Sequence, residues 1–225
     1  MNEYSVYVIS NKPQYFSEIQ EAAVPEPIAF FDGTGIGSFS KLVNTCVASA
    51  STEIVILMSD KVRPSAEAIQ KTVRLINQGY GFVALYRFGF FGFKKELMRQ
   101  IGVMDEGFSG GGYEDDDFYL RLREANIAMY ATEEVPYDNR PSSWNSEITK
   151  PYFIEKWVDT TWENYDPNGK MSNNRIERKI PEPPHTYDLG PSKPTPFLNW
   201  DYTVVETFRA RKFARLSNKS KRKTL

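Results

Sequence analysis

Short apolar runs alternate with amphipathic stretches over about the first 140 residues. The run at 54–58 is apolar throughout and ends at Ser59-Asp60, which is typical of a parallel strand covered on both faces. Strand-length apolar segments lie at 6–10, 28–31, 54–58, 82–91 and 127–131. Apolar residues recur at helical spacing in five segments, 15–23, 40–50, 64–76, 94–101 and 115–125, which we expect to be helices. Ser40 is the expected cap of the second of them. This alternation predicts an α/β domain whose mainly parallel sheet is flanked by helices.

Beyond about residue 140 the pattern changes. Six prolines lie between Pro181 and Pro196, so this stretch is expected to be extended or looped. We expect a core at 1–140, an irregular, proline-rich appendage packed on that core at 141–203, and a basic helix with a disordered tail at 204–225.

Composition narrows the class of protein. Hydrophobic residues make up 40% of the chain and charged residues 25%, as in ordinary globular proteins. No segment approaches the ~20 apolar residues of a membrane span, and no signal peptide is visible, so we expect a cytoplasmic protein. Cys46 and His185 are the only cysteine and histidine, which excludes a Cys/His zinc site. A metal would need oxygen ligands, which suits Mg²⁺ or Mn²⁺.

The charge is distributed unevenly. Eight basic residues and no acid follow Glu206, and the preceding part holds 20 basic against 29 acidic residues. An acidic body argues against nucleic-acid binding, because phosphate contacts need positive charge. The basic tail is expected either to touch a membrane surface or a partner protein, to lead into a further domain, or only to solubilise the chain.

Polar residues follow three of the predicted strands. Asn11, Asp32 and Asp60 stand at strand ends, and ligands of open parallel sheets bind at the carboxyl ends of strands. Turn preference is the alternative explanation for each of them. Asp60, after Ser59, is a candidate ligand of a divalent ion that also binds a diphosphate.

The second candidate feature is an acidic run behind a glycine loop, Gly110 to Gly112, Tyr113, and Glu114 to Asp117. The helix dipole favours one or two acids in a first helical turn, so a solvated helix start is the alternative. Four acids beside three glycines favour a general base and ligands of sugar hydroxyls, with glycines that let the backbone approach a sugar closely.

The order of these motifs, with Gly102 to Phe108 and Gly112 to Arg121 as the specific part, resembles GT-A-fold glycosyltransferases. The similarity is greatest to the family 2 and β-1,4-galactosyltransferase types and covers about residues 4–140. It implies a nucleotide-sugar donor, usually linked to UDP, a glycan or glycoprotein acceptor, and Mn²⁺ or Mg²⁺. The Rossmann-like GT-A sheet is the fold that it implies.

The resemblance also implies roles for individual residues. Asn11, Asp32, Ser59 and Asp60 would bind the nucleotide, with Asp32 on the base and Asp60 on the metal. Met58 stands in place of the first acid of the family's metal motif, and Asp138 would replace its metal-binding histidine. Asp115 would be the catalytic base, assisted by Asp116. The sugar and acceptor ligands would be Gly112, Tyr113, Glu114 and Asp116. Trp144, one of the aromatic residues that follow the motif, is expected either to stack on an acceptor sugar or to pack the appendage onto the core.

These features predict sugar transfer to an acceptor hydroxyl, with inversion at the anomeric carbon. A nucleotidyltransferase that forms nucleotide sugars is one alternative, although the loop Asn11-Lys12-Pro13 lacks the glycines of its phosphate loop. A non-enzymatic sugar- or Ca²⁺-binding module is another, although consecutive acids do not match the alternating ligands of a calcium loop.

Overall fold

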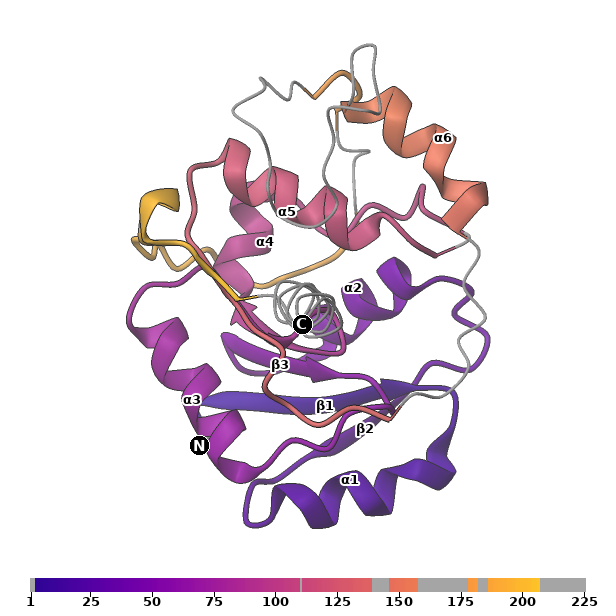
Figure 1. Ribbon diagram of the computed structural model, residues 1–225, viewed down its shortest axis with the longest axis vertical. Coiled ribbons are helices and arrows are strands. Elements are labelled where there is room, and N and C mark those ends of the chain that lie inside the picture. Colours follow the sequence, from indigo (N-terminus) through magenta and orange to yellow (C-terminus); the bar gives the residue numbers. More distant parts are fainter. Residues whose placement is uncertain (1–2, 110, 139–145, 158–177, 182–185, 207–225) are drawn as a thin grey trace, which may run out of the picture.

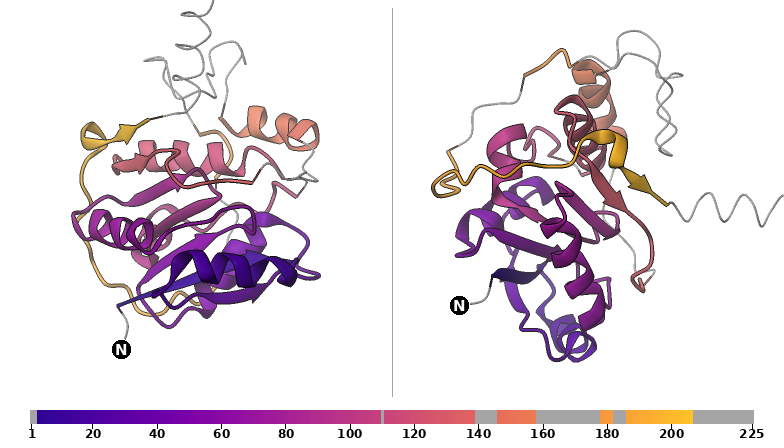
Figure 2. Two further views of the ribbon diagram at one scale, coloured as in Figure 1. Left: turned by 60° about the horizontal axis from the view of Figure 1, so that its bottom comes forward. Right: turned by 90° about the vertical axis from the view of Figure 1, so that its left-hand side faces the viewer.

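The computed structural model of the protein describes residues 3–109, 111–138, 146–157, 178–181 and 186–206. Among these residues one seven-stranded sheet forms, in the order β2-β1-β3-β5-β4-β6-β7 (Figures 1 and 2). Its strands are β1 Tyr4–Ser10, β2 Ala29–Asp32, β3 Ile54–Met58, β4 Phe82–Tyr86, β5 Phe90–Lys94, β6 Met129–Ala131 and β7 Val204–Val205. Only β5 runs antiparallel to its neighbours, β3 and β4. The mainly parallel α/β fold is therefore confirmed.

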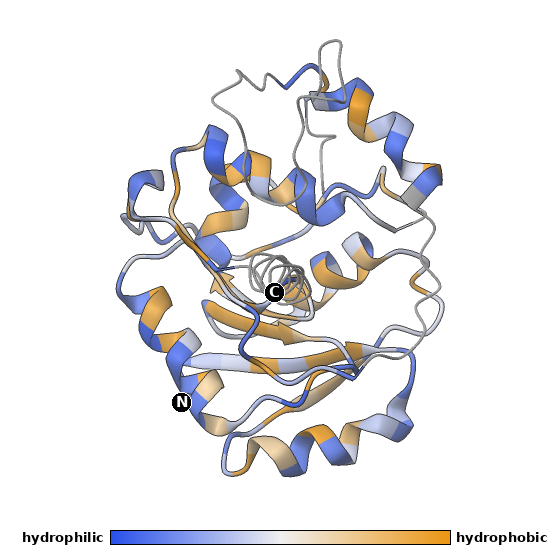
Figure 3. Cartoon of the chain, viewed as in Figure 1, coloured by the Kyte–Doolittle hydropathy of each residue, from blue (hydrophilic) through white to orange (hydrophobic). Residues whose placement is uncertain are grey.

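Helices cover both faces of the sheet. They are α1 Phe16–Ala23, α2 Phe39–Ser49, α3 Ala66–Asn77, α4 Lys95–Ile101, α5 Glu114–Glu124 and α6 Ser146–Trp157, with 3₁₀ turns at Pro13–Tyr15 and Trp200–Tyr202. Apolar residues of α1 and α3 pack in one core, and those of α2, α4 and α5 pack in another on the opposite face. Figure 3 shows the apolar residues filling much of the sheet, while α1 and α3 alternate apolar and polar positions.

The start of α2 differs from the prediction. Ser38, not Ser40, is the cap, and its hydroxyl accepts a hydrogen bond from the Lys41 N–H at 3.2 Å. Ser40 is fully buried one residue inside the helix. Ser38 and Ser40 have equal capping ability and stand two positions apart, and the packing of Phe39 and Val43 into the core places the helix start at the earlier one.

The aromatic stretch at 82–91 forms two antiparallel strands, not one. Gly89 N–H donates to the Tyr86 carbonyl at 2.8 Å and closes the turn between β4 and β5. Arg87, within this turn, adopts a left-handed backbone with φ 42°. The turn thereby places Arg87 and Phe88 at the edge of the sheet where the predicted site residues lie.

Two expectations for the second half of the chain are corrected. Val204 and Val205 form β7, parallel to β6, and not the start of a helix, because β-branched residues suit an edge strand paired to an existing sheet. The segment predicted to be irregular contains the helix α6. Residues 186–199 contain no helix or strand, and the predicted basic tail at 207–225 lies outside the described residues.

No helix among the described residues combines the length and the apolar character that crossing a bilayer requires.

Candidate active site

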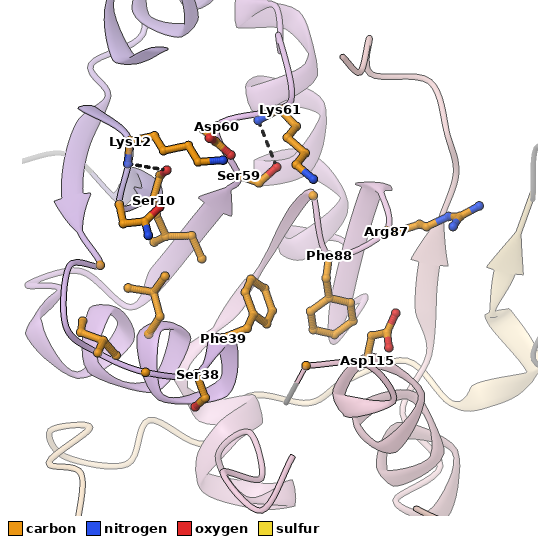
Figure 4. Close-up of a pocket in the computed structure, with 18 of the residues that line it drawn as sticks. Ser10, Lys12, Ser38, Phe39, Ser59, Asp60, Lys61, Arg87, Phe88 and Asp115 are labelled. Atoms are coloured by element: carbon orange, nitrogen blue, oxygen red, sulfur yellow. Dashed lines mark hydrogen bonds between the residues drawn. The ribbon is translucent and has the colours of Figure 1, made fainter. Parts of the chain in front are cut away.

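A pocket of about 740 Å³ lies at the carboxyl ends of β1 and β3 (Figure 4). The loop before α2, the turn between β4 and β5, and the start of α5 complete its walls. Its polar lining includes Ser10, Asn11, Lys12, Ser38, Ser59, Asp60, Lys61, Arg87, Ser109 and Asp115. Figure 4 shows Asp60 and Asp115 on opposite sides of the pocket, with Phe39 and Phe88 between them. Two carboxylates separated by 55 positions in the sequence thus share one site.

Four of the predicted site residues line this pocket, namely Asn11, Ser59, Asp60 and Asp115. Asp32 lies beside it, since the next residue, Gly33, is part of the lining. The Asp32 carboxylate is exposed and accepts hydrogen bonds from the Thr34 N–H at 2.9 Å and the Thr34 hydroxyl at 2.7 Å. These bonds lower the pKa of Asp32 and keep the carboxylate ionised.

The residues predicted to bind the sugar are not part of the pocket lining. Gly112, Tyr113, Glu114 and Asp116 are not among the lining residues, although Gly111 is. Gly111 and Gly112 have φ values of 76° and 94°, which shows why glycines precede the acidic run. Trp144 lies outside the described residues.

Sequence reasoning assigned no role to the two lysines of this pocket. Lys12 follows β1 and Lys61 follows β3, each two residues after a serine. The backbone N–H of each lysine donates to that serine hydroxyl, at 3.0 Å for Ser10 and 3.3 Å for Ser59. The Ser-x-Lys sequence that follows two apolar strands is the pattern in the sequence that indicates these two lysines.

The residues predicted to hold a metal were tested against the geometry. Asp60 is 8% exposed and lines the pocket, but Met58, in the place of the first acid, is fully buried in the core. The Asp138 carboxylate forms an ion pair with Arg63 at 3.0 Å. Among the described residues no group of three or more His, Cys, Asp or Glu is placed to hold an ion. These residues do not form a metal site by themselves, so the metal remains a prediction.

The four acids of α5 occupy different environments. Asp117 is fully buried, and Arg121 bonds its Oδ2 through Nε at 3.0 Å and Nη2 at 2.9 Å. Lys156 and the Trp157 indole N–H, both on α6, each bind the other oxygen, Oδ1, at 2.7 Å. This carboxylate is held by structural contacts and is not available to a substrate.

Glu114 is nearly as buried, at 2% exposed, but its two carboxyl oxygens have no hydrogen-bond partner in the described part of the chain. Burial, and secondly the charge of Asp115, raises the pKa of Glu114 to about 8. At neutral pH this side chain is therefore mostly a neutral acid, able to donate a hydrogen bond.

Asp115 lies at the pocket surface and is only partly covered. Its Oδ1 accepts a hydrogen bond from the Asp116 N–H at 3.1 Å. Desolvation raises the pKa of Asp115, while that N–H and the positive charge of Arg87 lower it. Arg87 is itself bonded to Glu133 at 2.6 Å. Asp115 is therefore a pocket carboxylate positioned to accept a proton, and its raised pKa makes it a stronger base than a free aspartate.

Helix α6 supports this site from behind. Its Lys156 bridges Asp117 to Asp105, with an Nζ–Oδ2 distance to Asp105 of 2.7 Å, and Tyr152 donates to the same Asp105 oxygen at 2.8 Å. The Thr149 hydroxyl donates to the carbonyls of Gly111 and Gly112, at 3.2 and 2.8 Å. The helix thus fixes both the glycine loop and the start of α5, which carries Asp115.

Residues 79–141 match the family model described as the N-terminal domain of galactosyltransferase. This segment contains β4, β5, β6 and the acidic run of α5. Together with the seven-stranded sheet, this match confirms the resemblance to GT-A-fold glycosyltransferases that the motif at 102–121 indicated. Within that class, the galactosyltransferase type is the one that the matched segment resembles.

One solved structure similar to the chain is that of a Drosophila β-1,4-galactosyltransferase 7 mutant in complex with manganese, UDP-Gal and xylobiose. The likeness has a TM-score of 0.44 and 14% identity, and it covers 62% of this chain and 68% of that chain. No curated protein matches the sequence.

Proposed function

We propose that this pocket transfers a sugar from a nucleoside-diphosphate sugar, most simply a UDP-sugar, to a hydroxyl of a glycan or glycoprotein acceptor, with inversion. The observation that carries the proposal is that Asp60 and Asp115 line one pocket from opposite sides. Its volume, about 740 Å³, lies in the usual range for small-molecule ligands. The strand-end wall would hold the nucleotide and the α5 wall would face the sugar.

Asp115 acts as the general base. It takes the proton of the acceptor hydroxyl while that oxygen forms a bond to the anomeric carbon. The bond between this carbon and the diphosphate oxygen breaks, and the nucleoside diphosphate leaves from the opposite face with the bonding electrons. Positioning and charge neutralisation supply most of the rate enhancement in such transfers.

The remaining assignments rest on the family resemblance of the motifs. Asn11, Asp32 and Ser59 are proposed to bind the nucleoside. Glu114 and Asp116 are proposed to hold hydroxyl groups of the sugar or the acceptor, together with Tyr113 and the backbone of Gly112. If a divalent ion binds with the donor, Asp60 is the carboxylate in the pocket that would contact it, and the ion would supply Lewis-acid charge neutralisation.

The test is a screen of nucleotide sugars for release of the nucleoside diphosphate, combined with thermal shift against UDP, UDP-sugars, Mn²⁺ and Ca²⁺. We expect one nucleotide sugar to be hydrolysed slowly without acceptor, and UDP to raise the melting temperature. A shift with Ca²⁺ alone, and no hydrolysis of any donor, would instead indicate a calcium-binding module. Formation of a nucleotide sugar from a nucleoside triphosphate and a sugar phosphate would indicate the nucleotidyltransferase.

A further inference from the structure

Two matching turns place a lysine each in the pocket. β1 and β3 are neighbouring parallel strands, with Val8 opposite Met58. Both strands lead into a Ser-x-Lys turn at the same edge of the sheet, and in both turns the serine hydroxyl accepts the N–H of the lysine. Lys12 and Lys61 are half-buried and line the pocket together.

The cations of the pocket are not equivalent. Arg87 donates to Glu133 and, in Figure 4, points away from Asp60 toward β6. The same figure shows Lys12 extending toward Asp60, with Lys61 beside it on the adjoining turn. Of the three lining cations in the described residues, the two lysines are thus on the Asp60 side, where strand ends of parallel sheets bind phosphates.

This arrangement bears on the charge of the leaving group. A nucleoside diphosphate gains a negative charge when its bond to the sugar breaks, so the pocket must supply positive charge at that point. Within the described ranges no cluster of metal-binding side chains surrounds Asp60, and Met58 contributes no ligand. The ammonium groups of Lys12 and Lys61, on these two hydrogen-bonded turns, carry positive charge of the kind that a bound metal ion would otherwise supply.

Resting on the function proposed above, we propose that Lys12 and Lys61 form the diphosphate subsite of the donor. Their ammonium groups bind the phosphate oxygens in the ground state and neutralise the departing diphosphate. Binding of a nucleoside diphosphate then does not require a divalent ion. A lysine is a compact charge with three donors, so each can contact oxygens of both phosphates.

The experiment is calorimetric titration of the full chain with UDP and with uridine, in a chelator of divalent ions. We expect UDP to bind in the chelator, Lys12→Ala and Lys61→Ala each to weaken UDP binding at least tenfold, and neither to change the affinity for uridine. Lys12→Arg and Lys61→Arg should restore most of the affinity, since they keep the charge. Lys41→Ala, an exposed lysine outside the pocket, is the matched control and should bind UDP normally.

The outcomes separate this subsite from the function itself. If UDP binds only when Mn²⁺ or Mg²⁺ is added, or if both alanine variants retain full affinity, the lysine subsite is wrong while the glycosyltransferase pocket stands. If no nucleotide or nucleotide sugar binds under any condition, with or without metal, the proposed function fails as well. Thermal melting of each variant checks that a loss of binding does not come from unfolding.

Discussion

Asp115 and Asp117 are identical residues two positions apart on one helix, yet they have opposite environments. Successive residues of an α-helix are rotated by about 100°, so these two carboxylates point to nearly opposite sides of α5. Asp117 faces α6 and is held by Arg121, Lys156 and Trp157. Asp115 faces the pocket, with no ion pair among the described residues and the Asp116 N–H as its hydrogen-bond donor. The acidic run therefore combines a structural anchor with a group free to take part in chemistry.

The largest expected effect comes from Asp115→Asn. Because an amide cannot accept the acceptor proton, we expect turnover to fall by ~10²–10⁴-fold, the usual contribution of general base catalysis. UDP affinity and melting temperature should stay close to those of the natural chain, since Asp115 makes no ion pair with another element in the described part of the chain. Steady-state kinetics with the donor found in the screen, together with UDP titration, measures both. Normal turnover in this variant would show that another group is the base.

The counterpart of that variant is Lys156→Met, on the anchored side of α5. It leaves Asp105 and Asp117 buried without their shared cation, and breaking a buried ion pair costs about 3–5 kcal/mol of stability. Chemical denaturation should show this loss as a lower midpoint. Glu155→Gln, on the exposed side of the same helix, is the control and should change stability little. Equal midpoints for the two variants would mean that the Lys156 contacts add nothing to the fold.

The residues that line the pocket could be predicted from the sequence more readily than the contacts between α5 and α6. Apolar runs ending in polar residues predicted that Asp60 and Asn11 would meet at one sheet edge, because the carboxyl ends of parallel strands share an edge. The glycine loop predicted that Asp115 begins a helix near them. These inferences need only local patterns and one topological rule.

Helix α6 could not be predicted in this way. Pro151 lies in its interior and removes a backbone donor, which argues against a helix from sequence alone. What stabilises it is tertiary: the buried side chains of Phe153 and Trp157, and the two carboxylates around Lys156. The partners of Lys156 are 39 and 51 positions away in the sequence, so no local pattern indicates them.

The next variant, Glu114→Gln, tests whether the buried carboxyl group of Glu114, at the start of α5, is neutral in the folded protein. The unfolded chain releases this proton near the ordinary value of 4.5, whereas the folded protein keeps it up to about pH 8. Stability contributed by this group is therefore present at low pH and lost as pH rises through that window. The variant does not titrate, so it should be more stable than the natural chain at pH 9, by on the order of a few kcal/mol, and similar to it at pH 4.

Denaturation midpoints of both proteins across pH 4–9 measure this difference. Glu21→Gln, exposed on α1, provides the control and should run parallel to the natural chain at every pH. A Glu114→Gln variant that also runs parallel would show that Glu114 titrates normally in the folded protein.

The smallest expected effect is on the pH dependence of turnover, and it concerns Arg87, whose positive charge acts on Asp115. Arg87 lowers the pKa of Asp115, in opposition to the rise that desolvation produces. A general base must be ionised, so activity is lost as pH falls through its pKa. Arg87→Met removes the positive charge, so the pKa of Asp115 should rise and the acidic limb of the pH–rate profile should move to higher pH.

Lys71→Met removes a half-buried cation paired with Glu134, outside the pocket lining, and should leave that limb in place. A profile of Arg87→Met that coincides with the Lys71→Met profile would contradict the coupling. A profile displaced only for Arg87→Met would assign the titration to the pocket side of α5, where the charge of Arg87 acts on Asp115.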